Sequence, residues 1–129
     1  MSWDEHDAAV FAASEEITIE TMRADGSFRP PVPIWVVVVD GDVYVRSSHG
    51  RDSGWFRGAL TRHRARVTTW AESRVVDLVE VADLDDALDE AYRDKYAAYR
   101  HSFLPRLVGA PARAAALRLE PAERSVLAR

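Results

Sequence analysis

The sequence contains no cysteine. This absence excludes a disulfide framework, a thiolate nucleophile and a cysteine-ligated metal site. Long apolar runs are missing too: the longest, Ile34 to Val39, is six residues, whereas a helix that spans a bilayer needs about 20. The opening of the chain is acidic and amphipathic rather than a basic start followed by an apolar run. We therefore expect a cytoplasmic protein with no membrane partner.

Lysine is almost absent as well, with Lys95 the only example, so nearly all of the positive charge is carried by arginine. The guanidinium of arginine forms two parallel hydrogen bonds with phosphate or carboxylate groups, which suits an anion site. Genomic base composition explains the preference for arginine over lysine equally well. Seven arginines between Arg46 and Arg74, interleaved with Trp55 and Trp70, fit a groove for single-stranded nucleic acid. Acidic clusters on both sides and a net charge of −4 oppose that interpretation. We expect no nucleic-acid partner.

The four histidines share no ligand spacing with a pair of carboxylates, so no metal site is expected. His49 follows Ser47 and Ser48 directly, which is a poor geometry for a catalytic triad, and no nucleophile-elbow pattern surrounds these serines. A hydrolase is therefore not the favoured class.

Length and composition indicate one globular domain over residues 1–129, because a chain of this size buries a single core and 47% of its residues are apolar. Alternating apolar residues predict strands, and "DG" at 40–41 predicts a hairpin turn. Acids followed by arginines predict a long helix that ends at Pro105. The expected elements are a helix at 3–14, strands near 16–23, 32–39, 42–48, 65–71 and 74–82, one or two helical turns after Ser53, a helix at 83–104 and a strand at 113–121.

This order of elements predicts a mainly β fold, a small antiparallel barrel with helices packed on its outside or ends. Short hairpins join neighbouring strands, and a late strand closes the barrel. No internal repeat or low-complexity segment interrupts the pattern.

The densest polar segment, "RSSHGRDSGWFR" at 46–57, directly follows the most apolar strand. Guanidinium groups, hydroxyls and backbone amides near a helix start are what a phosphate needs. A solvated loop is the alternative, since no fixed glycine fingerprint is present. Trp55 fits either a plug over the barrel end or a platform that stacks on a ligand. Thr21 and Arg23 reach the same place if the first and third strands are neighbours, and otherwise Arg23 is an exposed turn residue.

Three tyrosines of the long predicted helix, Tyr92, Tyr96 and Tyr99, follow one another at spacings of four and three. Core packing is the ordinary role of such residues. A functional role would be donation of a hydrogen bond or a proton to a bound substrate. The sequence pattern leaves both open.

Taken together, these motifs resemble the FMN-binding split-barrel superfamily. The chain is most similar to an uncharacterised family of unknown function near the deazaflavin-dependent nitroreductases and pyridoxamine phosphate oxidase-like proteins. The resemblance rests on "ETMRADGSFRPPVPIWVVVVDGDVYVRSSHG", "GWFRGALTRHRARVTTW", "YRDKYAAYRHSFLPR" and "ALRLEP". It implies a six-stranded antiparallel split β-barrel with an N-terminal helix and a long helix before the last strand, assembled as a homodimer.

The resemblance also implies a cofactor, FMN or a deazaflavin, held between the barrels, and a reaction that transfers a hydride to a small electrophilic or nitro-aromatic substrate. Carried over by motif, the cofactor-binding residues are Thr21, Arg23, Arg46, Ser47, Ser48, Arg51, Trp55 and Arg57, and the catalytic ones are Tyr96 and Tyr99. The chain departs from the nitroreductase pattern at Gly58, Ala59 and Leu60, which stand where an asparagine and a leucine are usual. A non-catalytic ligand-binding barrel is the alternative from another functional class.

Overall fold

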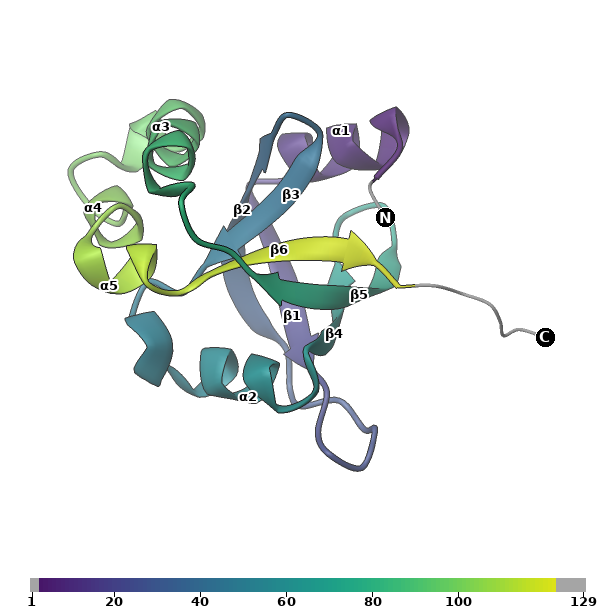
Figure 1. Ribbon diagram of the computed structural model, residues 1–129. Coiled ribbons are helices and arrows are strands. Elements are labelled where there is room, and N and C mark those ends of the chain that lie inside the picture. Colours follow the sequence, from purple (N-terminus) through teal and green to yellow (C-terminus); the bar gives the residue numbers. More distant parts are fainter. Residues whose placement is uncertain (1–2, 123–129) are drawn as a thin grey trace.

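The computed structural model describes residues 3–122, which form a closed barrel of six antiparallel strands with helices around it (Figure 1). Around the barrel the strands follow the order β1-β2-β3-β6-β5-β4. Their bounds are Glu16–Thr21 (β1), Val32–Val39 (β2), Asp42–Arg46 (β3), Arg64–Thr68 (β4), Ser73–Glu80 (β5) and Ala116–Pro121 (β6). The helices are Glu5–Ala13 (α1), Gly54–Arg62 (α2), Asp85–Lys95 (α3), Leu104–Leu107 (α4) and Ala110–Arg113 (α5), with short 3-10 turns at Gly50–Asp52 and Ala97–Tyr99. The expected mainly β fold, a six-stranded antiparallel barrel with helices, is confirmed.

The β2–β3 hairpin turns at Asp40 and Gly41, as predicted. Both have positive φ, 52° and 83°, which is the backbone of the tight turn that "DG" favours. β4 and β5 form the second hairpin. β1 closes the barrel between β2 and β4, and β6 inserts between β3 and β5.

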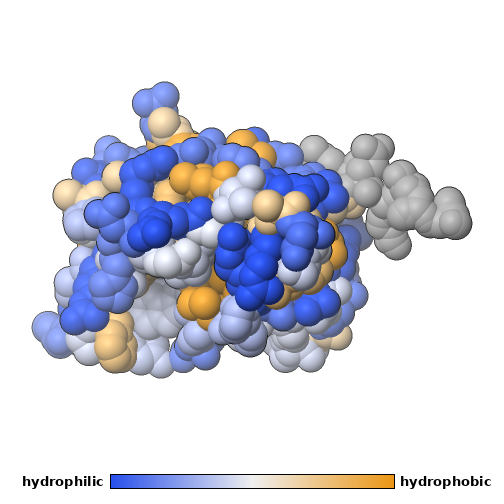
Figure 2. Space-filling model, turned by 90° about the horizontal axis from the view of Figure 1, so that it is seen from below, coloured by the Kyte–Doolittle hydropathy of each residue, from blue (hydrophilic) through white to orange (hydrophobic). Residues whose placement is uncertain are grey.

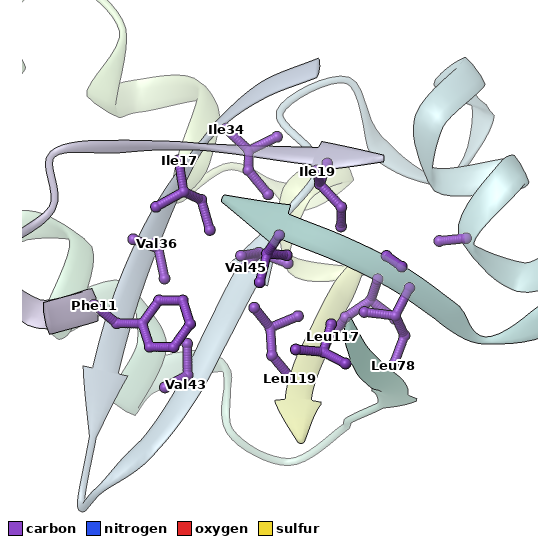
Figure 3. Close-up of a cluster of buried hydrophobic side chains, with 14 of the residues drawn as sticks. Phe11, Ile17, Ile19, Ile34, Val36, Val43, Val45, Leu78, Leu117 and Leu119 are labelled. Carbon is purple, nitrogen blue, oxygen red and sulfur yellow. The ribbon is translucent and has the colours of Figure 1, made fainter. Parts of the chain in front are cut away.

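The barrel interior is filled by the inward-facing residue of each alternating pair (Figure 3). On β1 these are Ile17 and Ile19, on β2 Ile34 and Val36, and all four are buried. Each such aliphatic side chain stabilises the fold by about 1.5–3 kcal/mol relative to its exposed state. The period of two therefore decides which face of every strand points inward.

Two helices cover the ends of the barrel. In Figure 1, α1 lies at the upper end and α2 at the lower end, and both send side chains into the interior cluster. α1 begins at the cap Asp4, whose carboxylate accepts from the amide of Asp7 at 2.8 Å. α2 begins at Ser53, whose hydroxyl accepts from the amide of Phe56. Capping by short polar side chains satisfies amides that lack helical partners.

A second apolar layer lies outside the barrel, where α3 and α4 pack on the outward-facing residues of β2 and β3 (Figure 1). Val37 and Tyr44 come from the strands, and Leu88, Tyr92 and Leu107 come from the helices. Because β2 is covered on both faces, its run of valines shows no alternation of polar and apolar residues.

The long helix expected over 83–104 is not continuous, which corrects the prediction from the sequence. α3 ends at Lys95, and the chain then turns through Ala97–Tyr99. The change of direction falls at Tyr96, whose φ and ψ are −109° and 29° and whose ring stacks on Trp35. Pro105 does not stop a helix but sits in the first turn of α4, where its missing amide donor is harmless.

The face that carries α2 and the β1–β2 connection is mainly hydrophilic, with small scattered hydrophobic areas (Figure 2). Within residues 3–122, no helix is both long and apolar enough to cross a bilayer.

Candidate functional site

A cleft of about 510 Å³ opens against β1, β2 and β3. Glu16 of β1 lies directly opposite Trp35 of β2, and both line the cleft. The segment after α3, which contains the 3-10 turn Ala97–Tyr99 and α4, forms one side of the cleft. The loop between β3 and α2 forms another side. The complete lining is Glu15, Glu16, Val32, Pro33, Ile34, Trp35, Arg46, Ser48, His49, Trp55, Tyr99, Phe103, Arg106 and Leu107.

The aromatic wall of the cleft is built on Tyr96. Its ring stacks on Trp35 with centroids 3.9 Å apart and planes at 1°. Its hydroxyl donates to the carbonyl of Glu15 at 2.6 Å and accepts from the amide of Val36 at 3.0 Å. Burial raises the pKa of Tyr96, so the phenol stays neutral. Tyr96 was predicted as catalytic, but it lies behind the wall and does not line the cleft.

Tyr99 does line the cleft, where its hydroxyl donates to Oε2 of Glu15 at 2.7 Å. That hydrogen bond and the charge of the carboxylate raise the pKa of Tyr99, because both favour the protonated phenol. Its ring lies 5.0 Å from Trp35. Of the two tyrosines predicted as catalytic, Tyr96 and Tyr99, only Tyr99 lines the cleft.

Arg46, the first predicted phosphate ligand, is committed to an internal ion pair. Its Nη1 lies 2.6 Å from Oδ1 of Asp89 and 2.8 Å from the carbonyl oxygen of Leu107, and its Nη2 donates to the carbonyl of Asp85. The side chain of Arg46 is 0% exposed. It forms part of the cleft wall and ties α3 and α4 to β3, so its charge is neutralised inside the chain.

The remaining basic and hydroxyl residues of the predicted loop divide into two groups. Ser48 and Trp55 line the cleft. Ser47 is buried and shares a 2.7 Å hydrogen bond with Ser53, while Arg51 pairs with Glu80 at 2.8 Å. Arg57 is exposed on α2 and is not part of the lining.

Gly50 does not bring backbone amides to a ligand. Its φ is +82°, and a Cβ there would lie 3.1 Å from the Cβ of Pro111. The glycine is required by the left-handed backbone and by close packing against α5.

Thr21 and Arg23 do not join the cleft, because β1 and β3 are not neighbours and β2 lies between them. Thr21 is buried at the far end of β1, where its hydroxyl accepts from Arg29 Nη1 at 3.3 Å. The same nitrogen donates to the carbonyl of Gly58 at 3.2 Å. Arg23 donates to the carbonyl of Phe28 within the β1–β2 connection. Thr21 and Arg23 would share an anion site with the loop after β3 only if β1 and β3 were neighbours, and they are not.

Trp55 lies between the barrel interior and the cleft, and its role as a platform that stacks on a ligand stays a prediction. It packs against the interior cluster from its half-buried position at the start of α2, and it also faces the cleft. Its ring meets Phe56 edge to face at 5.9 Å.

Several lining residues were not found from the sequence, and acidic, basic and aromatic side chains are all among them. These are Glu15, Glu16, Trp35, His49, Phe103 and Arg106. Trp35 faces outward because its neighbours Ile34 and Val36 point inward, but the uniformly apolar run of β2 did not mark this in the sequence. Nothing local marked Phe103 and Arg106, which reach the cleft only because the helix breaks at Tyr96. No cluster of three or more metal-ligating side chains occurs in the described part of the chain.

The charges of the cleft differ between its strands. Glu15 and Glu16 belong to the β1 side, whereas Ser48 and His49 follow β3 on the other side of β2. The Ser48 hydroxyl and Nδ1 of His49 are 3.2 Å apart. Arg106 adds a guanidinium from α4, and no carboxylate of the described residues lies within ion-pair distance of it. The cleft therefore offers carboxylates on one side and donors suited to an anion elsewhere.

Residues 7–119 match the profile of a family described as an uncharacterised protein conserved in bacteria, DUF2255. The chain belongs to this family. A sequence search of curated proteins finds no significant match.

Solved structures share the fold of this DUF2255 chain at low sequence identity. An F420-H2-dependent reductase has a TM-score of 0.60 and 15% identity, with 82% of this chain and 94% of that chain covered. A FAD-binding protein from Mesorhizobium loti has a TM-score of 0.59 and 14% identity, with 95% and 93% covered. The haem storage protein HutZ from Vibrio cholerae has a TM-score of 0.63 and 11% identity, with 96% and 93% covered. These structures share with the chain the six-stranded antiparallel barrel that the sequence motifs implied.

Proposed function

We propose that this DUF2255 protein binds a flavin-type cofactor, FMN or a deazaflavin, in the cleft on the β1–β2–β3 wall and acts as an oxidoreductase. The observation that carries the proposal is the lining itself. It combines aromatic side chains with a hydroxyl, an imidazole and the guanidinium of Arg106, which has no carboxylate partner among residues 3–122. The cleft measures about 510 Å³, a volume within the usual range of sites for small molecules and cofactors. Two of the structural neighbours named above are a cofactor-dependent reductase and a FAD-binding protein.

The donor set fits the anionic part of such a cofactor. Ser48, His49 and Arg106 would hold the phosphate, because hydroxyl, imidazole and guanidinium groups all donate hydrogen bonds to phosphate oxygens. Trp35 and Trp55 offer faces for the ring system. This set replaces Arg46, Ser47, Arg51, Arg57, Thr21 and Arg23, whose side chains are engaged within the chain or lie outside the cleft.

When bound, such a cofactor supplies the electrons and hydrogen for reduction of a small electrophilic or nitro-aromatic substrate. The contribution of the chain is binding, orientation and a proton. Tyr99 is the donor, since its phenol lies in the cleft and stays protonated beside Glu15. Tyr96 and Trp35 keep the wall rigid.

The assembly that we propose is a homodimer in which a second copy covers the open cleft. Phe103 supports this, because it lines the cleft and yet is 56% exposed in the single chain. Contiguous exposed apolar patches mark interaction surfaces, and Phe103 continues the row of rings formed by Trp35 and Tyr99. Light scattering on the purified protein measures the assembly directly, and a monomer at all concentrations would reject it.

Titration of the purified protein with FMN and with a deazaflavin, followed by absorbance and by cofactor fluorescence, tests the proposal. We expect saturable binding of one of them, weakened about tenfold or more in Arg106→Gln, since a charge-assisted phosphate contact is worth about 1.5–3 kcal/mol. Arg57→Gln is the matched control: it removes the same charge from an exposed helix position outside the cleft and should leave the affinity within about twofold.

Failure of both cofactors to bind rejects the proposal, as does an equal loss in the two variants. Turnover is tested separately with a nitro-aromatic acceptor and the reduced cofactor. Tyr99→Phe should lower kcat by about 10²-fold while leaving cofactor affinity unchanged. Binding without any turnover would favour the alternative function, a ligand-binding barrel without catalysis.

A further inference from the structure

The β1 side of the cleft joins two carboxylates to three aromatic rings. We call this set, Glu15, Glu16, Trp35, Tyr99 and Phe103, the acidic aromatic patch. Glu16 lies opposite Trp35 in the strand register, and the rings of Trp35 and Tyr99 are 5.0 Å apart. The chain of rings continues from Tyr99 to Phe103 at 6.5 Å. The five side chains thus form one continuous surface of the cleft.

The two carboxylates of the patch form no direct ion pair with the described residues. No arginine, lysine or histidine of residues 3–122 forms an ion pair with Glu15 or Glu16. Lys95 interacts electrostatically with Glu15, but its amine donates to the carbonyls of Phe11 and Val36 and forms no ion pair with the patch. One oxygen of Glu15 accepts from Tyr99, which leaves the negative charge of this carboxylate in place.

The patch has the chemistry of a site for organic cations. The face of an aromatic ring is negative and attracts ammonium groups within about 6 Å, and nearby carboxylates strengthen that attraction. The same carboxylates repel anions. We propose that the acidic aromatic patch is the substrate side of the cleft and that it selects planar or compact organic cations over neutral or anionic molecules of equal size. Describing the ligand as the substrate rests on the proposed function, and the electrophilic or nitro-aromatic substrate of that function would then carry a positive charge. The cation site itself does not rest on the proposed function.

The anion-binding residues of the same cleft are compatible with this selection. Of the two arginines that line the cleft, Arg46 is paired with Asp89, whereas Arg106 has no carboxylate partner among the described residues. The phosphate of a bound cofactor would neutralise the charge of Arg106. The two carboxylates on β1 would then dominate the field that the substrate meets. We therefore expect cation selectivity to be larger with the cofactor bound than without it.

Three probes of matched size test the inference: benzyltrimethylammonium, benzyl alcohol and benzenesulfonate, titrated into the full chain and followed by tryptophan fluorescence and calorimetry. We expect the ammonium to bind at least about tenfold more tightly than the sulfonate. Added salt should weaken the ammonium more than the alcohol, because screening acts on the charged pair.

Glu16→Gln and Glu90→Gln form the matched pair of variants. Both residues are exposed acids, but Glu16 belongs to the patch and Glu90 lies on α3 outside the lining. We expect about a three- to tenfold loss of ammonium affinity in Glu16→Gln and less than twofold in Glu90→Gln. Circular dichroism checks that both variants fold.

Equal affinity for the ammonium and the sulfonate, or equal losses in the two variants, would overturn the inference. The proposed function can fail independently. Ammonium selectivity in a protein that binds neither FMN nor a deazaflavin retains the cation site and rejects the cofactor, whereas cofactor binding with no preference among the three probes rejects the cation site alone.

Discussion

Substitutions of Arg46 and its buried partner Asp89 test which of two roles Arg46 has. The sequence predicts Arg46 as a phosphate ligand, whereas the structure pairs it with Asp89. Nη1 of Arg46 lies 2.6 Å from Oδ1 of Asp89, and the two side chains are 0% and 7% exposed. The other oxygen of Asp89 lies 3.2 Å from Nε of Arg113. Asp89 therefore has two cationic partners, whereas the carboxylate nearest to Arg46 after Asp89 is that of Asp85, at 3.8 Å and half exposed.

This asymmetry fixes the order of the expected losses. Asp89→Leu leaves the buried guanidinium of Arg46 without its partner and should lower the free energy of unfolding by about 3–5 kcal/mol. Arg46→Met leaves Asp89 with Arg113 and should cost about 1–3 kcal/mol. The double variant removes both buried charges and fills their volume, so it should be less destabilised than the sum of the two singles by at least about 2 kcal/mol.

Urea unfolding followed by tryptophan fluorescence measures all three variants against a native stability expected at about 5–15 kcal/mol. Additive losses would show that the two side chains do not interact. If Arg46→Met instead kept its full stability and lost the affinity for a flavin-type cofactor, the ion-pair reasoning would be refuted and Arg46 would return as a phosphate ligand.

Three further outcomes are expected from the packing. Gly58→Ala should lower stability by about 1–3 kcal/mol in a thermal melt, because the new Cβ would lie 2.8 Å from Oγ1 of Thr21 and 3.1 Å from Nη1 of Arg29; an unchanged melting temperature would contradict this contact. Burial lowers the pKa of Lys95 to about 8, so NMR of this single lysine should show titration near that pH. In the unfolded chain the Lys95 amine keeps its proton up to about pH 10.4, so above about pH 8 the unfolded state binds more protons than the folded state. The free energy of unfolding should therefore rise with pH from about 8 until tyrosines ionise. In a Lys95→Met variant the free energy of unfolding should stay constant over the same pH range. Tyr96→Phe should cost about 1–3 kcal/mol by leaving backbone groups of Glu15 and Val36 unpaired, and an unfolding curve that matches the wild type would refute this role for the hydroxyl.

Local patterns explain why the strands and their turns were predictable. A strand that separates core from solvent shows its period of two directly, as in β1, where Ile17 and Ile19 face inward. The turn at Asp40 and Gly41 needs positive φ at both residues, and only a few residue types accept it. These signals depend on neighbours in sequence, so the sequence contained them.

The helix break at Tyr96 depends on distant residues. Its ring stacks on Trp35 and its hydroxyl bonds to Glu15, which lies 81 positions earlier. Helical propensity and charge order continue smoothly past Tyr96, so no local signal marks the break. Phe103 and Arg106 enter the cleft only because of it.

The sequence by itself determined the barrel and the hairpins, because periodicity, turn chemistry and motif order are properties of adjacent residues. Only the tertiary structure decided which polar residues remain available for a ligand. Arg46, Thr21 and Arg51 carry the right groups for an anion, yet each is engaged within the chain, by Asp89, Arg29 and Glu80 respectively. A side chain's freedom to bind a ligand depends on what packs against it in three dimensions, and its identity and spacing do not reveal that.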